Sequence, residues 1–180
     1  MSIYLIRHAQ SEFNAAYQDD MPDPMIFDAP LSKLGQAQAV EARSEAAGLF
    51  VENIIVSPLT RALQTADLIF ERNLPTQVDP LVREQLCHSG DVGTRPEMLA
   101  RDWGHLEFGH LDDPWWYDGE KNHLGFGVEP LVSLEKRAAA FVEWAKQVQL
   151  NSTAIVTHGN FIRVLTGIQP DNCQILKLEV

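Results

Sequence analysis

The sequence contains few cysteines and no long run of apolar residues. Cys87 and Cys173 are the two cysteines among its 180 residues, too few for a disulfide scaffold and without the paired spacing of a zinc site. We therefore expect both thiols to be reduced. The apolar run at residues 3–6 is interrupted by Arg7 and His8, so it cannot form the core of a signal peptide. Since no stretch of about 18 apolar residues occurs either, we expect a soluble, cytoplasmic protein with no membrane partner.

Basic residues are scarce relative to acidic ones. The chain has 14 lysines and arginines against 25 aspartates and glutamates, and its net charge is -11. This charge would repel the phosphate backbone that a nucleic-acid-binding protein must neutralise, so we expect no nucleic-acid partner. The length is close to that of one domain of about 150 residues, and 45% of the residues are hydrophobic. We predict a single domain over residues 1–180 that folds without metal or disulfide.

The hydrophobic pattern favours alternating strands and helices. Residues 3–6, 53–56 and 153–156 are rich in β-branched residues without polar alternation, which is typical of strands buried on both faces of a parallel sheet. Apolar residues recur at helical spacing over residues 59–70 and 134–148, and a third helix is expected over residues 32–47. We predict an α/β fold, a three-layer α/β/α sandwich with a mostly parallel central sheet.

Three residues bear on these helices. Pro58 suits the first turn of the helix over residues 59–70, and Ser133 is expected to cap the helix over residues 134–148. Gly35 is the weak point of the helix over residues 32–47, because glycine has a low helix propensity.

Residues 85–130 break the alternation of strands and helices. Glycines and prolines punctuate this segment, which holds nine acidic residues against three basic ones. Long irregular segments in compact domains tend to be functional or disordered, and the tryptophans of this one argue against disorder. We predict an inserted lid or cap over about residues 85–130; whether it closes over a substrate is left open.

Arginine and histidine side chains follow the predicted strands. Arg7 and His8 come directly after the first strand, and Arg61 lies one turn into the helix that follows the second. His158 and Gly159 follow the last strand. Ligands of open α/β sheets bind outside the carboxyl ends of the strands, where guanidinium groups and helix N-termini both attract phosphate oxygens. The sequence therefore predicts an anion site, with phosphate as the favoured ligand.

Four blocks of sequence carry these residues: LIRHAQSEFN at 5–14, DAPLSKLGQAQA at 28–39, SPLTRALQTA at 57–66 and VTHG at 156–159. In this order they resemble the histidine phosphatase superfamily, the phosphoglycerate-mutase-like clan. The resemblance extends from residue 3 to a terminal strand near Leu178. One departure is Ala9, where the family most often has glycine; a methyl group would crowd the turn if that turn requires a positive φ.

The resemblance implies a role for each residue of the predicted site. His8 would be the nucleophile, attacking phosphorus as a neutral imidazole to form a phosphohistidine, and Glu84 would be the general acid for the leaving group. The substrate phosphate would be bound by Arg7, Asn14, Arg61, His158 and Gly159. Because this chemistry depends on positioning and electrostatics, it implies no metal and no cofactor.

Other polar residues are weaker candidates. His88 lies four residues past Glu84 and is the best candidate for a further substrate contact. The remaining histidines lack the spacing of a metal site and are expected in the lid or at the surface: His105, His110 and His123. A polyanionic substrate would require at least one further arginine to reach the pocket, with three to choose from: Arg83, Arg95 and Arg163.

The resemblance covers both phosphatases and mutases, and mutases of the family are typically longer than this chain. We therefore predict a metal-independent phosphatase that hydrolyses phosphomonoesters, with a small phosphorylated metabolite as its substrate. Three alternatives stay open, namely a phosphoglycerate-type mutase, a phosphohistidine-protein phosphatase and a catalytically silent binding module. The sequence indicates neither the physiological substrate nor the oligomeric state.

Overall fold

The computed structural model describes residues 2–178, and these residues form one five-stranded sheet in the order β3-β2-β4-β1-β5. The strands are β1 (Ile3–Arg7), β2 (Asn53–Val56), β3 (Thr76–Val78), β4 (Thr153–Thr157) and β5 (Ile175–Leu178). All neighbouring strands are parallel except β5, which runs antiparallel to β1. This mixed, mostly parallel sheet confirms the predicted α/β fold.

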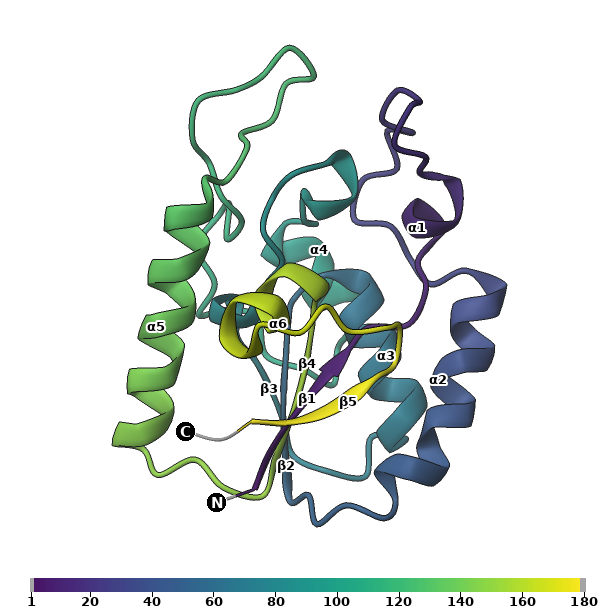
Figure 1. The fold of residues 1–180 in the computed structure, drawn as a ribbon, viewed down its shortest axis with the longest axis vertical. Coiled ribbons are helices and arrows are strands. Elements are labelled where there is room, and N and C mark those ends of the chain that lie inside the picture. The colour runs from purple at the N-terminus through teal and green to yellow at the C-terminus, as the bar shows by residue number, and fades with distance from the viewer. Residues whose placement is uncertain (1, 179–180) are drawn as a thin grey trace.

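Helices cover both faces of the sheet (Figure 1). One face carries α2 (Lys33–Ala46), α3 (Thr60–Phe70) and α4 (Pro96–Asp102), and the other carries α5 (Leu131–Gln147) and α6 (Gly159–Thr166). Neighbouring residues of β1 show the division, because Ile6 packs in the first core and Leu5 in the second. Since both faces are buried along β2, β4 and β1, these central strands are apolar without regular alternation.

Shorter elements connect this framework. Helix α1 (Glu12–Ala16) follows β1, and two 3₁₀ turns, η1 (Pro80–Val82) and η2 (Ser89–Asp91), follow β3. Within residues 2–178, no helix is both long enough and apolar enough to span a membrane.

The predicted start of α5 is wrong. The helix begins at Leu131 with Pro130 as its N-cap, and Ser133 lies inside the first turn. There the Ser133 hydroxyl donates a hydrogen bond to Glu129 Oε1 over 3.1 Å. Glu129 is itself anchored, because its N–H donates to the carbonyl of Leu86 over 2.7 Å. The hydrogen bond from Glu129 to Leu86, which is distant in sequence, therefore fixes the chain just before the helix, and no serine caps its first turn.

The predicted start of α3 is wrong for a similar reason. Pro58 lies before the helix, which begins at Thr60 after the N-cap residue Leu59. Leu59 has no side-chain acceptor for the helix, but Asp28 supplies one from the preceding connection. Its carboxylate accepts the N–H and the hydroxyl of Thr60, each over 2.8 Å. The first turn is thus capped by tertiary structure.

Gly35 in α2 has a packing function. A Cβ atom at this position would lie 1.9 Å from the carbonyl oxygen of Gln10. That same carbonyl accepts the N–H of Ser32, and the Ser32 hydroxyl donates to Gln10 Oε1 over 2.7 Å. Only glycine lets α2 approach the loop after β1 this closely. Gly35, although it weakens the helix, therefore allows α2 to pack against the turn that follows His8.

The segment over residues 85–130 is partly built into the core. Its buried side chains Leu99, Phe108 and Trp115 pack in the same core as α3. The Trp115 indole N–H also donates to the carbonyl of Thr94 over 2.8 Å. The start of the segment, including η2, lies at the carboxyl ends of the strands, above α3 and α6 in Figure 1.

Candidate active site

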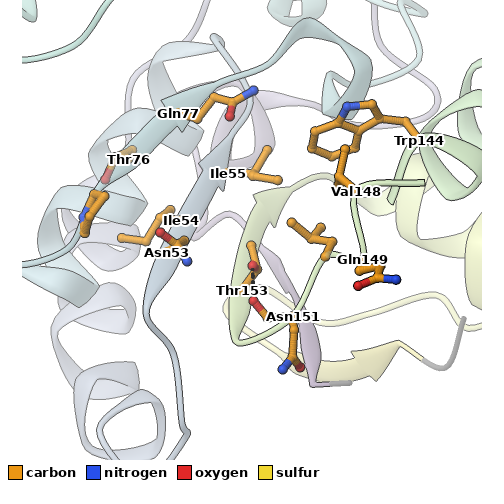
Figure 2. A pocket seen from close by; sticks show the side chains of 12 residues that line it. Asn53, Ile54, Ile55, Thr76, Gln77, Trp144, Val148, Gln149, Asn151 and Thr153 are labelled. Atoms are coloured by element: carbon orange, nitrogen blue, oxygen red, sulfur yellow. Dashed lines mark hydrogen bonds between the residues drawn. The ribbon is translucent and has the colours of Figure 1, made fainter. Parts of the chain in front are cut away.

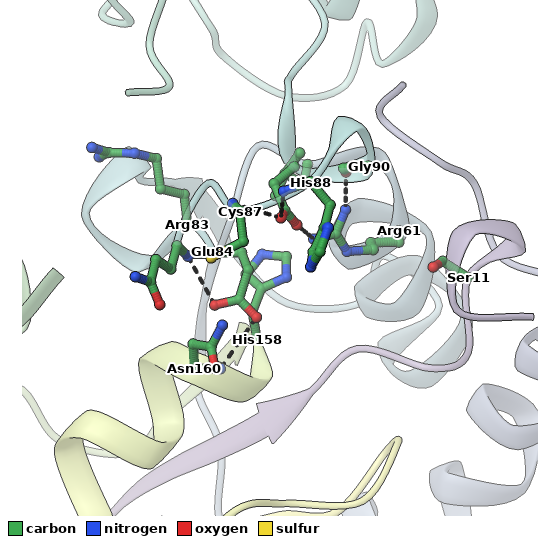
Figure 3. Close-up of polar contacts among 12 residues, drawn as sticks. Ser11, Arg61, Arg83, Glu84, Cys87, His88, Gly90, His158 and Asn160 are labelled. Atoms are coloured by element: carbon green, nitrogen blue, oxygen red, sulfur yellow. Dashed lines mark hydrogen bonds and ion pairs between the residues drawn. The ribbon is translucent and has the colours of Figure 1, made fainter. Parts of the chain in front are cut away.

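A cavity of about 170 Å³ lies at the carboxyl ends of β1 and β4. Five of the predicted site residues line it, namely Arg7, His8, Asn14, Arg61 and Glu84. The wall is completed by Ser11, Phe13, Cys87, His88, Asp91 and Asn160. The two remaining predicted residues, His158 and Gly159, are buried beside this wall. Figure 3 shows how polar side chains from α3, α6 and the loop after β3 converge, with Arg61, Asn160 and Glu84 among them.

His8 presents one ring nitrogen to this cavity as a free base. Its Nδ1 lies 2.7 Å from the carbonyl oxygen of Ala9, which can only accept, so Nδ1 carries the hydrogen. Its Nε2 lies 3.2 Å from Arg61 Nε, which can only donate, so Nε2 holds a lone pair. Burial and the charges of Arg61 and Arg7 hold the pKa of His8 well below its ordinary value. The ring is therefore neutral, with Nε2 as its nucleophilic atom.

The backbone after β1 holds this ring in place. The His8 N–H donates to the carbonyl of Thr157 over 2.9 Å, and Asn172 Nδ2 donates to the His8 carbonyl over 2.9 Å. The next N–H, that of Ala9, donates to Thr65 Oγ1 over 3.1 Å. Ala9 is fully buried and its φ is not positive. The departure from the glycine of the family pattern therefore causes no backbone strain.

Arg61 is held on each of its nitrogens. Its NH1 donates to the carbonyl of Gly90 and its NH2 lies 2.8 Å from Asp91 Oδ1, while Nε faces His8. Only 4% of the residue is exposed. The guanidinium is thus oriented before any ligand binds, which avoids the entropic cost of ordering a flexible arginine.

Arg7 and His158 each keep one buried nitrogen without a hydrogen-bond partner among the described residues. These atoms are Arg7 Nε and His158 Nδ1. The His158 ring lies 5.0 Å from that of His8, centroid to centroid, and Gly159 packs behind Arg7, where a Cβ would lie 3.5 Å from Arg7 Nε. Buried unpaired donors are costly and call for a partner. A phosphate oxygen is a suitable one.

Ser57 contacts one ring nitrogen of His158. Its Oγ accepts the N–H of Leu59 over 3.3 Å and lies 2.7 Å from His158 Nε2. A serine hydroxyl both donates and accepts, so this contact fits either tautomer of the neutral ring. Burial, with the charge of Arg61, keeps the pKa of His158 well below its ordinary value. The His158 ring is therefore neutral.

Glu84 is positioned to hold a proton. Its Oε1 accepts the N–H of Gln85 over 2.9 Å and its Oε2 accepts the N–H of Asn160 over 3.2 Å. Burial raises the pKa of the carboxyl group, and the neighbouring charge of Asp91 raises it further. From α5, Arg137 donates to the carbonyl of Glu84 over 3.2 Å and fixes this part of the loop. A raised pKa suits a general acid.

Asn14 lines the cavity from α1. Its Oδ1 accepts the N–H and the hydroxyl of Ser11 over 3.2 and 3.0 Å, and its own N–H donates to Ser11 Oγ. This capping box orients the amide and leaves its NH₂ group to donate elsewhere. Asn14 is exposed, in contrast to the buried His8 and Arg61.

Among the histidines that were weaker candidates, His88 lies at the cavity, whereas His105 and His110 lie elsewhere. His88 lines the cavity and contacts Tyr17, with ring centroids 4.7 Å apart. His105 lies near Asp67, and His110 Nε2 lies 2.8 Å from the carbonyl of Val78. Neither lines the cavity, and no cluster of three potential metal ligands occurs in the part of the chain that the structure describes.

The three additional arginines also differ. Arg83 Nη2 faces Glu129 at 3.8 Å and Arg95 pairs with Asp113 at 3.1 Å, both away from the cavity wall. Arg163 on α6 is exposed, and its charge acts on Cys87 in that wall.

Sequence reasoning missed two residues that contact the basic side chains of this site. Asp91 counted only as one acidic residue of the irregular segment, although it pairs with Arg61. Ser57 was the end of a strand, although it contacts His158. Glu84 and Asp91 are separated by irregular chain and Ser57 precedes the helix that carries Arg61, so the sequence spacing gave no signal of these contacts.

Comparisons with known proteins give a consistent picture. A family profile described as the histidine phosphatase superfamily (branch 1) matches residues 3–174. Glucosyl-3-phosphoglycerate phosphatase of Mycolicibacterium vanbaalenii is 29% identical over 181 residues, which cover 97% of this chain and 78% of that protein. A Hydrogenobacter thermophilus protein, provisionally named phosphoserine phosphatase 2, is 32% identical over 94% of this chain and 81% of its own.

Solved structures show the same fold. A mycobacterial glucosyl-3-phosphoglycerate phosphatase in complex with VO3 superposes with a TM-score of 0.65 and 21% identity, covering 99% of this chain and 90% of that chain. At this identity the likeness establishes the architecture of the sheet and its helices.

Proposed function

The chain belongs to the histidine phosphatase superfamily (branch 1), and from this membership we propose that it hydrolyses phosphomonoesters of small metabolites through a phosphohistidine on His8. One observation carries the proposal. His8 Nε2 is an unprotonated nitrogen in a small cavity, where it accepts a hydrogen bond from Arg61; burial and the charges of Arg61 and Arg7 keep the ring neutral. A neutral imidazole beside fixed positive charge is the combination that attack on a phosphate ester requires.

The first step transfers the phosphoryl group to the protein. His8 Nε2 forms a bond to phosphorus as the ester P–O bond breaks, and Glu84 gives its proton to the departing oxygen. The product alcohol leaves neutral, and the ring carries the phosphoryl group. The carbonyl of Ala9 accepts the Nδ1 hydrogen and stabilises the positive charge that develops on the ring. Arg7 and Arg61 neutralise the phosphoryl oxygens.

The second step releases inorganic phosphate. Water attacks phosphorus, and the N–P bond breaks with return of its electron pair to His8 Nε2. Glu84, now a carboxylate, takes a proton from that water and is restored to its starting form.

Small substrates are favoured by the dimensions of the site. The cavity of about 170 Å³ accommodates a phosphoryl group and a few further atoms. His88 and Asn14 lie on its wall, where they can contact the remainder of a substrate. The two curated relatives above carry the names of phosphatases for a glycosylated phosphoglycerate and for phosphoserine. Both are phosphomonoesters of small carboxylic acids, so compounds of this class come first in a test.

The test is phosphate release from a panel of phosphorylated sugars, sugar acids, amino acids, nucleotides and phosphohistidine peptides, with a chelator present. His8→Ala serves as the blank, and His105→Ala, a histidine outside the cavity, serves as its matched control. We expect chelator-resistant release from one or more small phosphomonoesters, lost in His8→Ala and retained in His105→Ala. Trapping of ³²P on the wild-type protein, stable to base and labile to acid, would identify the phosphohistidine.

Other results would overturn this proposal. Isomerisation of phosphoglycerate that needs a bisphosphate primer, with little hydrolysis, would indicate a mutase. Release only from phosphohistidine peptides would indicate a protein phosphatase. A folded wild-type protein that binds phosphate esters but neither hydrolyses nor isomerises them would indicate a binding module.

A further inference from the structure

Asp91 connects two parts of the site that come from different regions of the chain. It ends η2 and lies on the cavity wall. Its Oδ1 pairs with Arg61 NH2 over 2.8 Å, while its Oδ2 accepts the N–H groups of Cys87 and His88, each over 3.1 Å. One carboxylate thus binds α3 and also the loop that leads away from Glu84.

The ion pair between Asp91 and Arg61 is protected from solvent. The side chains are 12% and 5% exposed, respectively, so their attraction is screened less than that of a surface pair. The carbonyl of Gly90 accepts a second hydrogen bond from the same guanidinium. Together, residues 90 and 91 hold Arg61 in the orientation that places its Nε against His8.

We propose that Asp91 is a positioning residue of the phosphatase reaction, which orients Arg61 toward His8 and keeps a negative charge beside Glu84 so that this acid is protonated when substrate binds. The inference rests on the proposed function. It adds a residue that touches neither the phosphoryl group nor the leaving group and that acts through its two neighbours.

The charges around Glu84 give Asp91 this influence. The charges of Arg7 on β1 and Arg61 on α3 act on Glu84, and Arg137 on α5 donates to its backbone carbonyl. The loop of Glu84 also carries the thiol of Cys87 and the carboxylate of Asp91. Burial and the nearby carboxylates raise the pKa of the Cys87 thiol to about 12, so this thiol is neutral. Burial is the largest cause of the raised pKa of Glu84, and Asp91 is the anionic neighbour that raises it further against the pull of the cations.

Loss of the Asp91 charge therefore has a predictable sign. Without it, burial still raises the pKa of Glu84, but the second contribution that raises it is lost, so this pKa falls. The acid is then deprotonated at a lower pH, so turnover that depends on protonation of the leaving group declines earlier as pH rises. Turnover of an ester with a good leaving group does not depend on that proton and keeps its profile.

The experiment compares pH profiles of kcat/KM for an alkyl phosphate and for 4-nitrophenyl phosphate. Asp91→Asn removes the charge and keeps the shape, and Asp91→Glu keeps the charge and changes the reach. Asp112→Asn, an exposed aspartate of the same segment, makes the same change in net charge away from the site. We expect the alkaline limb for the alkyl phosphate to move down by about one pH unit in Asp91→Asn, and to stay in place in Asp91→Glu and Asp112→Asn.

Two results would overturn the inference. One is an unchanged limb in a folded Asp91→Asn protein; the other is an equal shift for both substrates, which would place the effect on a group other than the acid. If Asp91→Asn does not fold, Asp91→Ser removes the charge while retaining one acceptor for the loop N–H groups.

A second readout separates this inference from the proposed function. Carboxyl ¹³C NMR titration, with Glu84→Gln to assign the signal, follows Glu84 without turnover. A lower titration midpoint in Asp91→Asn supports the coupling even if the wild-type protein hydrolyses none of the panel. An identical midpoint overturns the coupling even if the wild-type protein is an active phosphatase.

Discussion

The two ends of the sheet carry two different cavities. At the amino ends of β2, β3 and β4, a cavity of about 560 Å³ lies between the sheet and α5 (Figure 2). Apolar and neutral polar side chains line it, including Ile55, Gln77, Trp144 and Asn151, and none of its wall residues is charged. At the carboxyl ends, the smaller cavity of about 170 Å³ has two arginines, two acids and two histidines in its wall.

This difference shows that the volume of a cavity does not indicate where the candidate catalytic residues lie in this molecule. The larger cavity holds no buried polar side-chain atom that lacks a partner, among the residues described. Beside the smaller one, Arg7 Nε and His158 Nδ1 are buried without partners, and burial shifts the pKa values of His8 and Glu84 in opposite directions. Opposed shifts within one pocket are typical of an acid and a base with separate roles.

The largest effect is expected from Arg61→Met at the carboxyl end. The substitution removes the charge next to His8 and leaves the carboxylate of Asp91 without its partner. We expect kcat/KM to fall by about 10³-fold on any substrate of the panel. Arg43→Met, which breaks a surface ion pair with Glu71, is the matched control and should retain activity. Steady-state kinetics on both variants measures kcat/KM. Equal losses in Arg61→Met and Arg43→Met would show that the effect is not specific to the cavity at the carboxyl ends.

The next effect distinguishes the acid from the cations that surround it. Glu84→Gln keeps the shape of the side chain but cannot donate a carboxyl proton. We expect kcat to fall by about 100-fold on alkyl phosphates, and by much less on 4-nitrophenyl phosphate, whose leaving group needs no proton. Rate measurements on a series of leaving groups test this, and parallel losses across the series would remove Glu84 from the acid role.

A smaller effect is expected from Ser57→Ala behind the cavity. The substitution removes the hydroxyl that faces His158 Nε2, so the ring loses this hydrogen bond. We expect phosphate or vanadate to bind about tenfold more weakly, with Ser133→Ala on α5 as a control that binds normally. Calorimetric titration gives the affinities, and ¹⁵N NMR of the ring gives the tautomer. Unchanged binding together with an altered tautomer would show that His158 does not contact the ligand.

The smallest effect on activity is expected at the amino end. Trp144 packs against the core at one side of the larger cavity. Trp144→Ala should lower the free energy of unfolding by about 2 kcal/mol and leave kcat within a factor of about two, because the sites are at opposite ends of the sheet. Chemical denaturation and steady-state kinetics are needed on the same sample. A large loss of kcat in a folded variant would show that the two ends are coupled.

Particular residues show which parts of the site could be predicted from the sequence. Arg7 and His8 follow a recognisable strand, and parallel strands bring their carboxyl ends to one edge, so the meeting of these residues with Arg61 followed from local pattern. Glu84 was identified by the family resemblance alone, since no pattern in the neighbouring sequence distinguishes it from a surface glutamate. The N-cap expected at Ser133 was wrong because Glu129, bound to a distant loop, sets the course of the chain there.

The sequence by itself determined the alternation of strands and helices and the order of the four motif blocks, because both depend on residues that are near one another in the chain. Tertiary structure alone decided the tautomer of His8, the orientation of Arg61 by Asp91, and the placement of the Glu84 loop by Arg137. Each of these depends on a hydrogen bond whose strength varies steeply with distance and angle. Such geometry is set by the packing of α3, α5 and the irregular segment around the sheet.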